Sequence, residues 1–176
     1  FMFENQITVD SRHILDEYLN SFEYQTSGLS FTSLFMWRNI NLFSWQIIGD
    51  YLCIAGISHL ELDKKEAFLF PPLTKTGDYK PSELRKTILE AKNIFEKKGQ
   101  KFSIRLLPSH MNGIIEAAFP GELNFYEDRA NHDYVYLTKD LIRLAGRQYH
   151  SKRNHLNYFK GHYNYKYVPL TSSMAE

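Results

Sequence analysis

Three strand-like segments followed by one long amphipathic helix constrain the fold of this chain more than any other feature. Residues 42–48 and 51–57 are apolar strand candidates joined by Gly49-Asp50, a two-residue hairpin signal. Residues 67–70 form a third strand, and Pro71-Pro72 ends it because proline cannot donate to a β-ladder. We therefore expect an antiparallel sheet built from consecutive strands.

The helix that follows is the clearest in the sequence. Pro81 suits a first helical turn, and Gly99 suits the position just after a helix. The apolar residues between them recur at helical spacing, at Leu84, Ile88, Ala91 and Phe95. Because such a stripe must be buried against another element, the pattern predicts an α+β domain with a mixed, mostly antiparallel sheet and flanking helices.

Further elements are expected on both sides of this centre. Asp10 or Ser11 can cap a first helix, whose apolar face is Ile14, Leu15, Tyr18, Leu19 and Phe22. A second helix is expected at 31–37, and a third, capped by Ser109, runs to Ala118. The remaining strand candidates are 3–9, 102–106, 123–126, 134–137 and 165–170. Residues 138–160 are helical in pattern, with a break at Gly146.

Composition limits the class of protein. A chain of 176 residues with 43% hydrophobic and 23% charged residues is globular in composition and long enough for one domain, or for one domain and an arm. There is no run of 18 apolar residues, and Met2 looks like the natural start. The single Cys53 lies in an apolar run and is expected to be buried, as is typical of a cytoplasmic protein. Trp37 and Trp45 are expected in the core or at an interface.

Charge is distributed unevenly along the chain. Seven basic residues stand against one acid between 139 and 166, a local charge of +6, so the other 148 residues carry −5. The seven are Lys139, Arg143, Arg147, Lys152, Arg153, Lys160 and Lys166. Such a segment favours contact with an anionic partner.

Three segments carry a resemblance to a known family. They are Gly146-Arg-Gln-Tyr-His-Ser-Lys-Arg-Asn-His-Leu-Asn-Tyr-Phe-Lys160, Ser30-Phe-Thr-Ser-Leu-Phe-Met-Trp-Arg38 and Phe70-Pro71-Pro72. In that order, they resemble the linker, the second helix and a short motif after the early strands of the phosphatidylglycerol lysyltransferase C-terminal-like family. That resemblance implies two tandem lobes of the acyl-CoA N-acyltransferase (GNAT-like) fold. It also implies kinship with transferases that use aminoacyl-tRNA to build peptidoglycan cross-bridges.

The resemblance also implies a domain organisation. Residues 2–138 correspond to the first lobe, 139–163 to a basic connecting helix and 164–176 to the start of a truncated second lobe. Ser173-x-x-Glu176 matches a capping box, which predicts the start of a helix. The alternative is that these residues belong to a polar tail. The expected partner is therefore the second GNAT-like lobe of the same protein. The related lysyltransferases carry membrane spans upstream of this domain.

This sequence matches the family's donor-binding loop poorly. In the family, the loop motif Arg/Gln-x-x-Gly-x-Gly/Ala supplies backbone N–H groups to a diphosphate at a helix N-terminus. The equivalent loop here, residues 72–81, has one glycine, adds Asp78 and loses a donor at Pro81. We expect this lobe to bind no cofactor, so that acyl-CoA or aminoacyl-tRNA belongs to the intact protein.

The basic segment is the candidate site. If it is helical, Tyr149, Arg153, Asn157 and Lys160 share one face, and Leu156, Phe159 and Tyr163 form a neighbouring stripe. We include Lys152 with the first set as substrate- or anion-binding residues. Cations interleaved with rings suit a tRNA, another phosphorylated donor or an anionic membrane surface. The alternative is a solvated helix whose Arg153 pairs with an acid of its own lobe.

Other chemistry is weakly indicated. His150 and His155 are about 140° apart on a helix, so no metal site is expected. The acidic pairs Asp63/Glu66 and Glu127/Asp128 are typical of solvated turns, and no catalytic residue is identified. Two hypotheses stand: one lobe of an acyl- or aminoacyltransferase, and a non-catalytic module that binds RNA or another anion.

Overall fold

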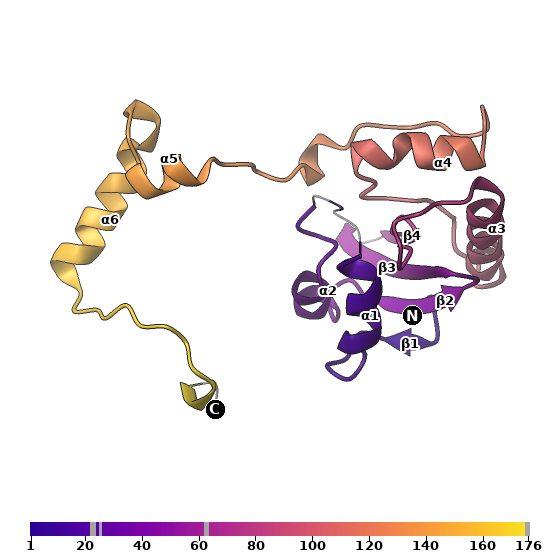
Figure 1. Ribbon diagram of the computed structural model, residues 1–176, viewed down its shortest axis with the longest axis horizontal. Helices are drawn as coiled ribbons and strands as arrows, with labels where there is room; N and C mark the ends of the chain where they lie inside the picture. The colour runs from indigo at the N-terminus through magenta and orange to yellow at the C-terminus, as the bar shows by residue number, and fades with distance from the viewer. Residues whose placement is uncertain (22–23, 25, 62–63, 175–176) are drawn as a thin grey trace. The chain divides into compact units, whose positions relative to one another are not determined.

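The computed structural model describes residues 1–21, 24, 26–61 and 64–174, without the side chains of 59–61, 64 and 65. It divides the chain into two compact units, Phe1–Asp133 and Tyr134–Glu176, which are described separately below (Figure 1). Three residues named above, Phe22, Asp63 and Glu176, lie outside the described part, so their expected roles stay predictions.

The first unit is built on a four-stranded antiparallel sheet in the order β1-β2-β3-β4. Its strands are β1 (Asn5–Gln6), β2 (Ser44–Ile48), β3 (Tyr51–Glu61) and β4 (Lys64–Leu69). Ile48 pairs with Tyr51, and Gly49 between them has φ 59°, so the expected two-residue hairpin is confirmed. The first strand is shorter than the segment 3–9 that was expected.

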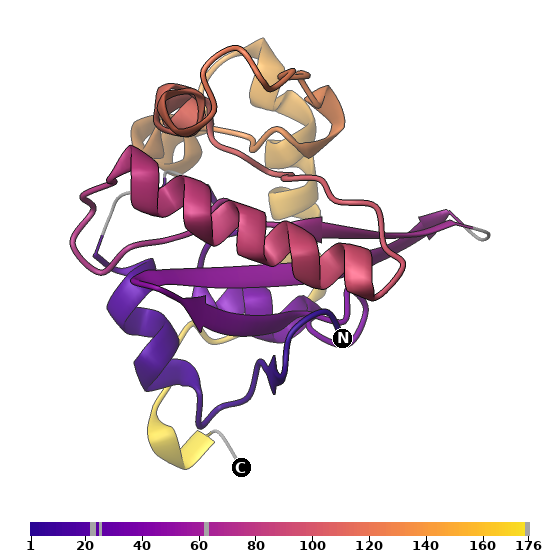
Figure 2. The same cartoon turned by 90° about the vertical axis from the view of Figure 1, so that its right-hand side faces the viewer.

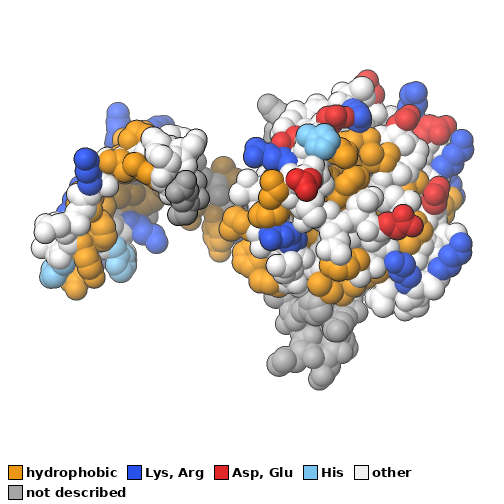
Figure 3. Space-filling model, turned by 90° about the horizontal axis from the view of Figure 1, so that it is seen from below, with side chains coloured by type: hydrophobic (Ala, Val, Ile, Leu, Met, Phe, Trp, Pro, Cys, Tyr) orange, Lys and Arg blue, Asp and Glu red, His pale blue; other side chains and the backbone are white. Residues whose placement is uncertain are grey.

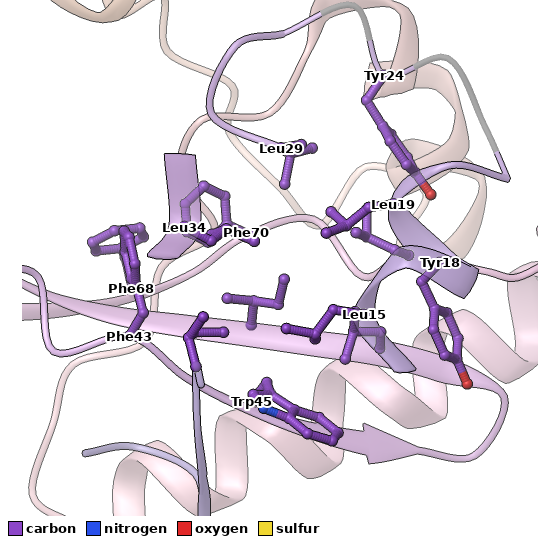
Figure 4. Close-up of a cluster of buried hydrophobic side chains, with 14 of the residues drawn as sticks. Leu15, Tyr18, Leu19, Tyr24, Leu29, Leu34, Phe43, Trp45, Phe68 and Phe70 are labelled. Carbon is purple, nitrogen blue, oxygen red and sulfur yellow. The ribbon is translucent and has the colours of Figure 1, made fainter. Parts of the chain in front are cut away.

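Helices cover both faces of this sheet because β3 alternates apolar side chains. Leu52 and Ile54 belong to the cluster formed with α1 (Arg12–Leu19) and α2 (Phe31–Trp37), drawn in Figure 4. Cys53 and Ala55 belong to the cluster on the other face, which contains Ala91 and Phe95 of α3 (Pro81–Lys97). Figure 2 shows α3 lying over one face of the sheet. The α+β class and the buried stripe of α3 are confirmed.

Close packing on the α1/α2 face makes Gly56 hard to replace. A Cβ at this position would lie 2.8 Å from ring carbons of both Phe43 and Phe68. We expect Gly56→Ala to destabilise the fold by about 1–3 kcal/mol through overpacking. Gly113→Ala in α4 (Asn112–Ala118), where nothing lies within 4 Å, is the matched control and should be neutral or stabilising by up to about 1 kcal/mol. Urea denaturation of both variants checks this, and an unchanged midpoint for Gly56→Ala would contradict it.

The chain after α3 is less regular than expected. The segment predicted as strand 102–106 makes a single parallel bridge, in which the Leu69 N–H donates to Ser103 O and the Arg105 N–H donates to Leu69 O. Leu106, expected to face inward, is exposed and has φ 58°. A 3₁₀ turn at Ser109–Met111 leads into α4 (Asn112–Ala118), and the Ser109 side chain makes no capping bond.

The predicted strands 123–126, 134–137 and 165–170 are wrong: none is paired in a ladder within the described residues. A strand needs a partner for its backbone N–H and C=O groups, and here these extended segments are exposed to water instead. Near the first of them a short 3₁₀ turn, Arg129–Asn131, precedes Asp133. Asp133 accepts hydrogen bonds from the Ser27 N–H and hydroxyl, which lower the pKa of its carboxyl.

The second unit consists of α5 (Thr138–Arg143), a 3₁₀ turn (Arg147–Tyr149), α6 (His150–His162) and a last turn (Ser172–Met174). The helical segment is interrupted at Leu144, with φ 47°, and at Gly146, with φ 91°, so the predicted break is confirmed. No described residue of this unit is buried. The unit therefore lacks a hydrophobic core within its described part.

Several single-residue expectations are settled by burial. Cys53 is buried as expected, and burial raises the pKa of its thiol, which keeps it protonated and unreactive. Trp45 is buried and donates to Gln6 O, whereas Trp37 is 51% exposed and so does not belong to the core. Among the described helices, none combines the length and the apolarity needed to cross a bilayer.

Candidate functional site

The predicted anion-binding residues lie on α6 and the turn before it. Tyr149 ends the 3₁₀ turn, and the other four, Lys152, Arg153, Asn157 and Lys160, lie on the helix. Lys152, Asn157 and Lys160 are exposed, while Tyr149 and Arg153 are partly buried. Figure 3 shows cationic, His and apolar side chains together on this unit.

Arg153 is partly engaged by the backbone. Its Nη1 donates to the carbonyl oxygens of Leu144 and Gly146, the second at 2.8 Å. These carbonyls lie where α5 ends, and a helix C-terminus favours such a cation. Arg153 thus fixes the break between the two helices, and its bonds go to carbonyl oxygens rather than to the carboxylate considered above.

The four site residues on α6 lie on two neighbouring parts of the helix surface. At 100° per residue, Arg153, Asn157 and Lys160 fall within a narrow arc, as expected. Lys152 instead falls beside Leu156 and Phe159, on the neighbouring apolar stripe. Lys152 therefore lies among the exposed apolar side chains, and Arg153 and Lys160 lie beside them, so the cations do not form one separate face.

Aromatic rings gather at the end of α6. Phe159 stacks on Tyr163 with centroids 5.2 Å apart and 26° between planes, and its centroid is also 5.2 Å from that of Tyr165. Tyr158 stacks on His162 at 3.9 Å. Helical spacing indicates Phe159 with Tyr163, but Tyr165 follows the helix, so spacing could not indicate it. Exposed rings beside cations suit a ligand that combines negative charge with flat groups.

Among the residues that the structure describes, ion pairs do not neutralise the charge of this segment. No ion pair in the described residues contains any of its seven cations. In water such charges attract anions over about 10 Å at 0.1 M salt. The segment can therefore bind an anionic surface or polymer, and that binding should weaken as salt rises.

The loop before α3 uses its amides internally. The Gly77 N–H donates to Thr74 Oγ1 at 2.7 Å, and the Asp78 N–H donates to Thr76 Oγ1 at 3.2 Å. The Lys80 N–H donates to the hydroxyl of Tyr51 at 3.2 Å. Pro81 then opens the helix without an N–H. These three amide donors are thus occupied by the chain itself, and the Leu73 N–H likewise donates to Leu52 O.

Tyr79 ties this loop to the core of the first unit. Its hydroxyl donates to Pro72 O at 2.9 Å, and its ring lies 5.9 Å from that of Tyr51. Burial, together with its neighbour Tyr24, raises the pKa of Tyr79, so the phenol stays protonated at neutral pH. The ring is partly buried and packs against the hydrophobic core of the first unit.

The other polar candidates serve as local partners. Glu66 pairs with Arg105, and Glu127 Oε1 lies 3.5 Å from His132 Nε2. Asp128 accepts a hydrogen bond from the Asn131 side chain at 2.7 Å. Among the residues that the structure describes, no group of three His, Cys, Asp or Glu side chains could hold a metal ion.

These features define an α+β domain with an exposed basic helical segment and a closed loop before its main helix. Comparison with known families adds the identity: this chain belongs to the family described as "Phosphatidylglycerol lysyltransferase, C-terminal", whose profile matches residues 19–176. The predicted family is confirmed. No curated protein matches the chain.

A solved structure extends this result. The chain is similar, at 28% identity and a TM-score of 0.69, to a conserved protein of unknown function from Bacteroides thetaiotaomicron VPI-5482. The match covers 95% of the present chain but only 53% of that protein. The chain thus spans about half the length of this relative.

Proposed function

We propose that this chain is the N-terminal lobe of an acyl- or aminoacyltransferase, with a GNAT-like fold, and that it shapes a substrate groove. Membership of the lysyltransferase family supports transfer chemistry. The length of the Bacteroides relative, of which the chain covers 53%, supports a second lobe. The lone buried Cys53 suits the reducing cytosol, where we place the protein.

The acyl donor is proposed to bind to the other lobe. The loop at 72–81 supports this division because the amides of Gly77, Asp78 and Lys80 donate to groups of this chain. The start of α3 is exposed, but Pro81 supplies no N–H there, and a diphosphate could use the amides of Gly77, Asp78 and Lys80 only by breaking these bonds. The transfer chemistry is therefore assigned to groups outside this lobe.

The observation that carries the groove-forming role is the basic segment of the second unit. It is fully described through α6, it has no buried residue, and its cations have no carboxylate partner within the described residues. Such a surface suits a tRNA or another phosphorylated donor, and an anionic membrane surface would meet the same charges.

A titration with acetyl-CoA tests whether the acyl donor binds to the other lobe. We expect the 176-residue chain to bind acetyl-CoA with a dissociation constant weaker than about 10 μM, because ~7 kcal/mol of binding is hard to reach without a phosphate loop. Isothermal titration calorimetry measures this directly. Tighter binding would place the donor site in this lobe and contradict the proposal.

The alternative is a non-catalytic module that binds RNA or another anion. The cations of α6, which make no ion pair within the described residues, and the rings stacked at the end of this helix favour it, since they need no second lobe to attract a nucleic acid. The two functions differ in the full-length protein. A transferase moves an aminoacyl or acyl group to an acceptor, whereas a binding module retains RNA without any turnover.

A further inference from the structure

A cavity in the first unit lies outside the regions used by the proposed function. Its volume is about 310 Å³, and it opens between the chain after β1 and the end of α2. Phe1 and Ile7 contribute to its wall, and the residues that bear on its chemistry are Gln6, Val9, Phe35, Arg38, Asn39 and Phe43. This size falls at the small end of the range for ligand pockets.

Arg38 is held in a fixed position at this cavity. Its Nη1 donates to the backbone oxygen of Phe35, and its guanidinium carbon lies 3.6 Å from the centroid of the Phe35 ring. The Phe35 ring is itself stacked on Phe31 at 5.7 Å. A guanidinium restrained in this way loses little side-chain entropy when it binds a ligand.

The charge of Arg38 has no carboxylate partner in the described part of the chain. The exposed side-chain amides of Gln6 and Asn39, which line the same cavity, make no hydrogen bond among those residues either. The cavity therefore offers a restrained cation and two side-chain amides as polar groups, together with Thr8, whose hydroxyl already accepts a hydrogen bond from the Ser11 N–H. Phe35, Phe43 and Val9 supply apolar wall beside them.

We propose that this cavity binds a small organic carboxylate, with the carboxylate on Arg38 and the apolar body against Phe35 and Phe43. A planar guanidinium can hold a carboxylate through two parallel N–H···O bonds. Gln6 and Asn39 contribute side-chain donors at the rim. Benzoate contains both required parts and is small enough for the cavity.

An NMR titration of the ¹⁵N-labelled chain with benzoate tests this site. We expect shifts confined to amides around residues 6–9 and 35–43, with a dissociation constant of about 1 mM, as suits a fragment-sized ligand. Benzamide, which has the same shape without the charge, should bind at least about tenfold more weakly. Inorganic phosphate distinguishes a general anion site: if it binds as well as benzoate, the apolar wall contributes nothing and the proposal fails.

Variants assign the binding to Arg38. Arg38→Gln should weaken benzoate binding at least about tenfold, and Arg38→Lys should keep part of it, because the charge remains without the planar fork. Arg12→Gln is the matched control, since Arg12 also lies near a ring of α2 but does not line this cavity. If Arg38→Gln fails to fold, Asn39→Asp, which adds a negative charge at the rim, should weaken binding similarly. Unchanged affinity in a folded Arg38→Gln or in Asn39→Asp would overturn the proposal, as would the absence of shifts at about 20 mM benzoate.

Discussion

Phe95→Ala is expected to lower the free energy of unfolding by about 3–5 kcal/mol. The Phe95 side chain is fully buried on α3, where it meets Phe3 and Phe102 edge to face with ring centroids 6.3 Å and 5.2 Å apart. Its removal leaves a cavity between α3 and the sheet. Because domains of this size are stable by only about 5–15 kcal/mol, such a loss should leave little margin at 37 °C.

Leu89→Ala on the same helix is the control for Phe95→Ala. Leu89 is 44% exposed, so its truncation should cost less than about 1 kcal/mol. Urea unfolding followed by far-UV circular dichroism measures both variants. Equal midpoints for the two would mean that α3 does not pack on the sheet through Phe95.

Lys152→Glu combined with Lys160→Glu is expected to weaken binding of tRNA to the chain by about 30-fold or more at low salt. Both lysines are exposed on α6 and make no ion pair among the described residues. Each lost phosphate contact should also lower the salt slope, log Kd against log salt, by about 1. Fluorescence anisotropy across a salt series measures both quantities.

The pair of lysines is chosen so that Arg153, which fixes the turn at Gly146, stays in place. Lys97→Glu combined with Lys101→Glu changes the net charge equally at two exposed sites in the first unit, and serves as the matched control. If both double variants weaken binding alike, only net charge matters. If Lys152→Glu with Lys160→Glu leaves affinity and slope unchanged, the basic segment is a solvated surface and the groove-forming role is wrong.

The elements predicted correctly from the sequence are those whose signals are local. Helix α2 begins and ends where expected, and Ser30 caps it through its hydroxyl, which accepts a hydrogen bond from the Ser33 N–H. The hairpin at Gly49 needs only a positive φ and two flanking strands. Helix α3 is delimited by Pro81 at its start and Gly99, with φ 68°, just beyond its end.

The failures concern elements whose stability depends on distant partners. Tyr134 to Leu137 alternates like a strand, but no neighbouring strand pairs with it in the described residues, and Val135 is 90% exposed. Segment 102–106 pairs with β4 only at Ile104. Leu106 adopts φ 58°, which is not a strand conformation, so the pairing cannot continue through it. Alternation indicates which residues could form strands, but it does not show that a partner edge exists.

The candidate site was predictable only in part. Spacing placed Arg153, Asn157 and Lys160 near one another, and the excess of cations was visible in the sequence. That Arg153 donates to the carbonyl oxygens of Leu144 and Gly146 depends on how the chain turns between two helices. The cavity at Arg38 joins β1 to α2 across more than thirty residues, so no local pattern indicates it.

The coding sequence downstream of Glu176 tests the central claim most directly. The account of this chain as the first lobe of a transferase predicts a further domain of similar size there. That domain should contain the phrase Arg/Gln-x-x-Gly-x-Gly/Ala at the start of a helix, which would supply the backbone donors that the loop at 72–81 uses internally. A stop codon directly after Glu176 would contradict the account and favour a binding module without transfer chemistry.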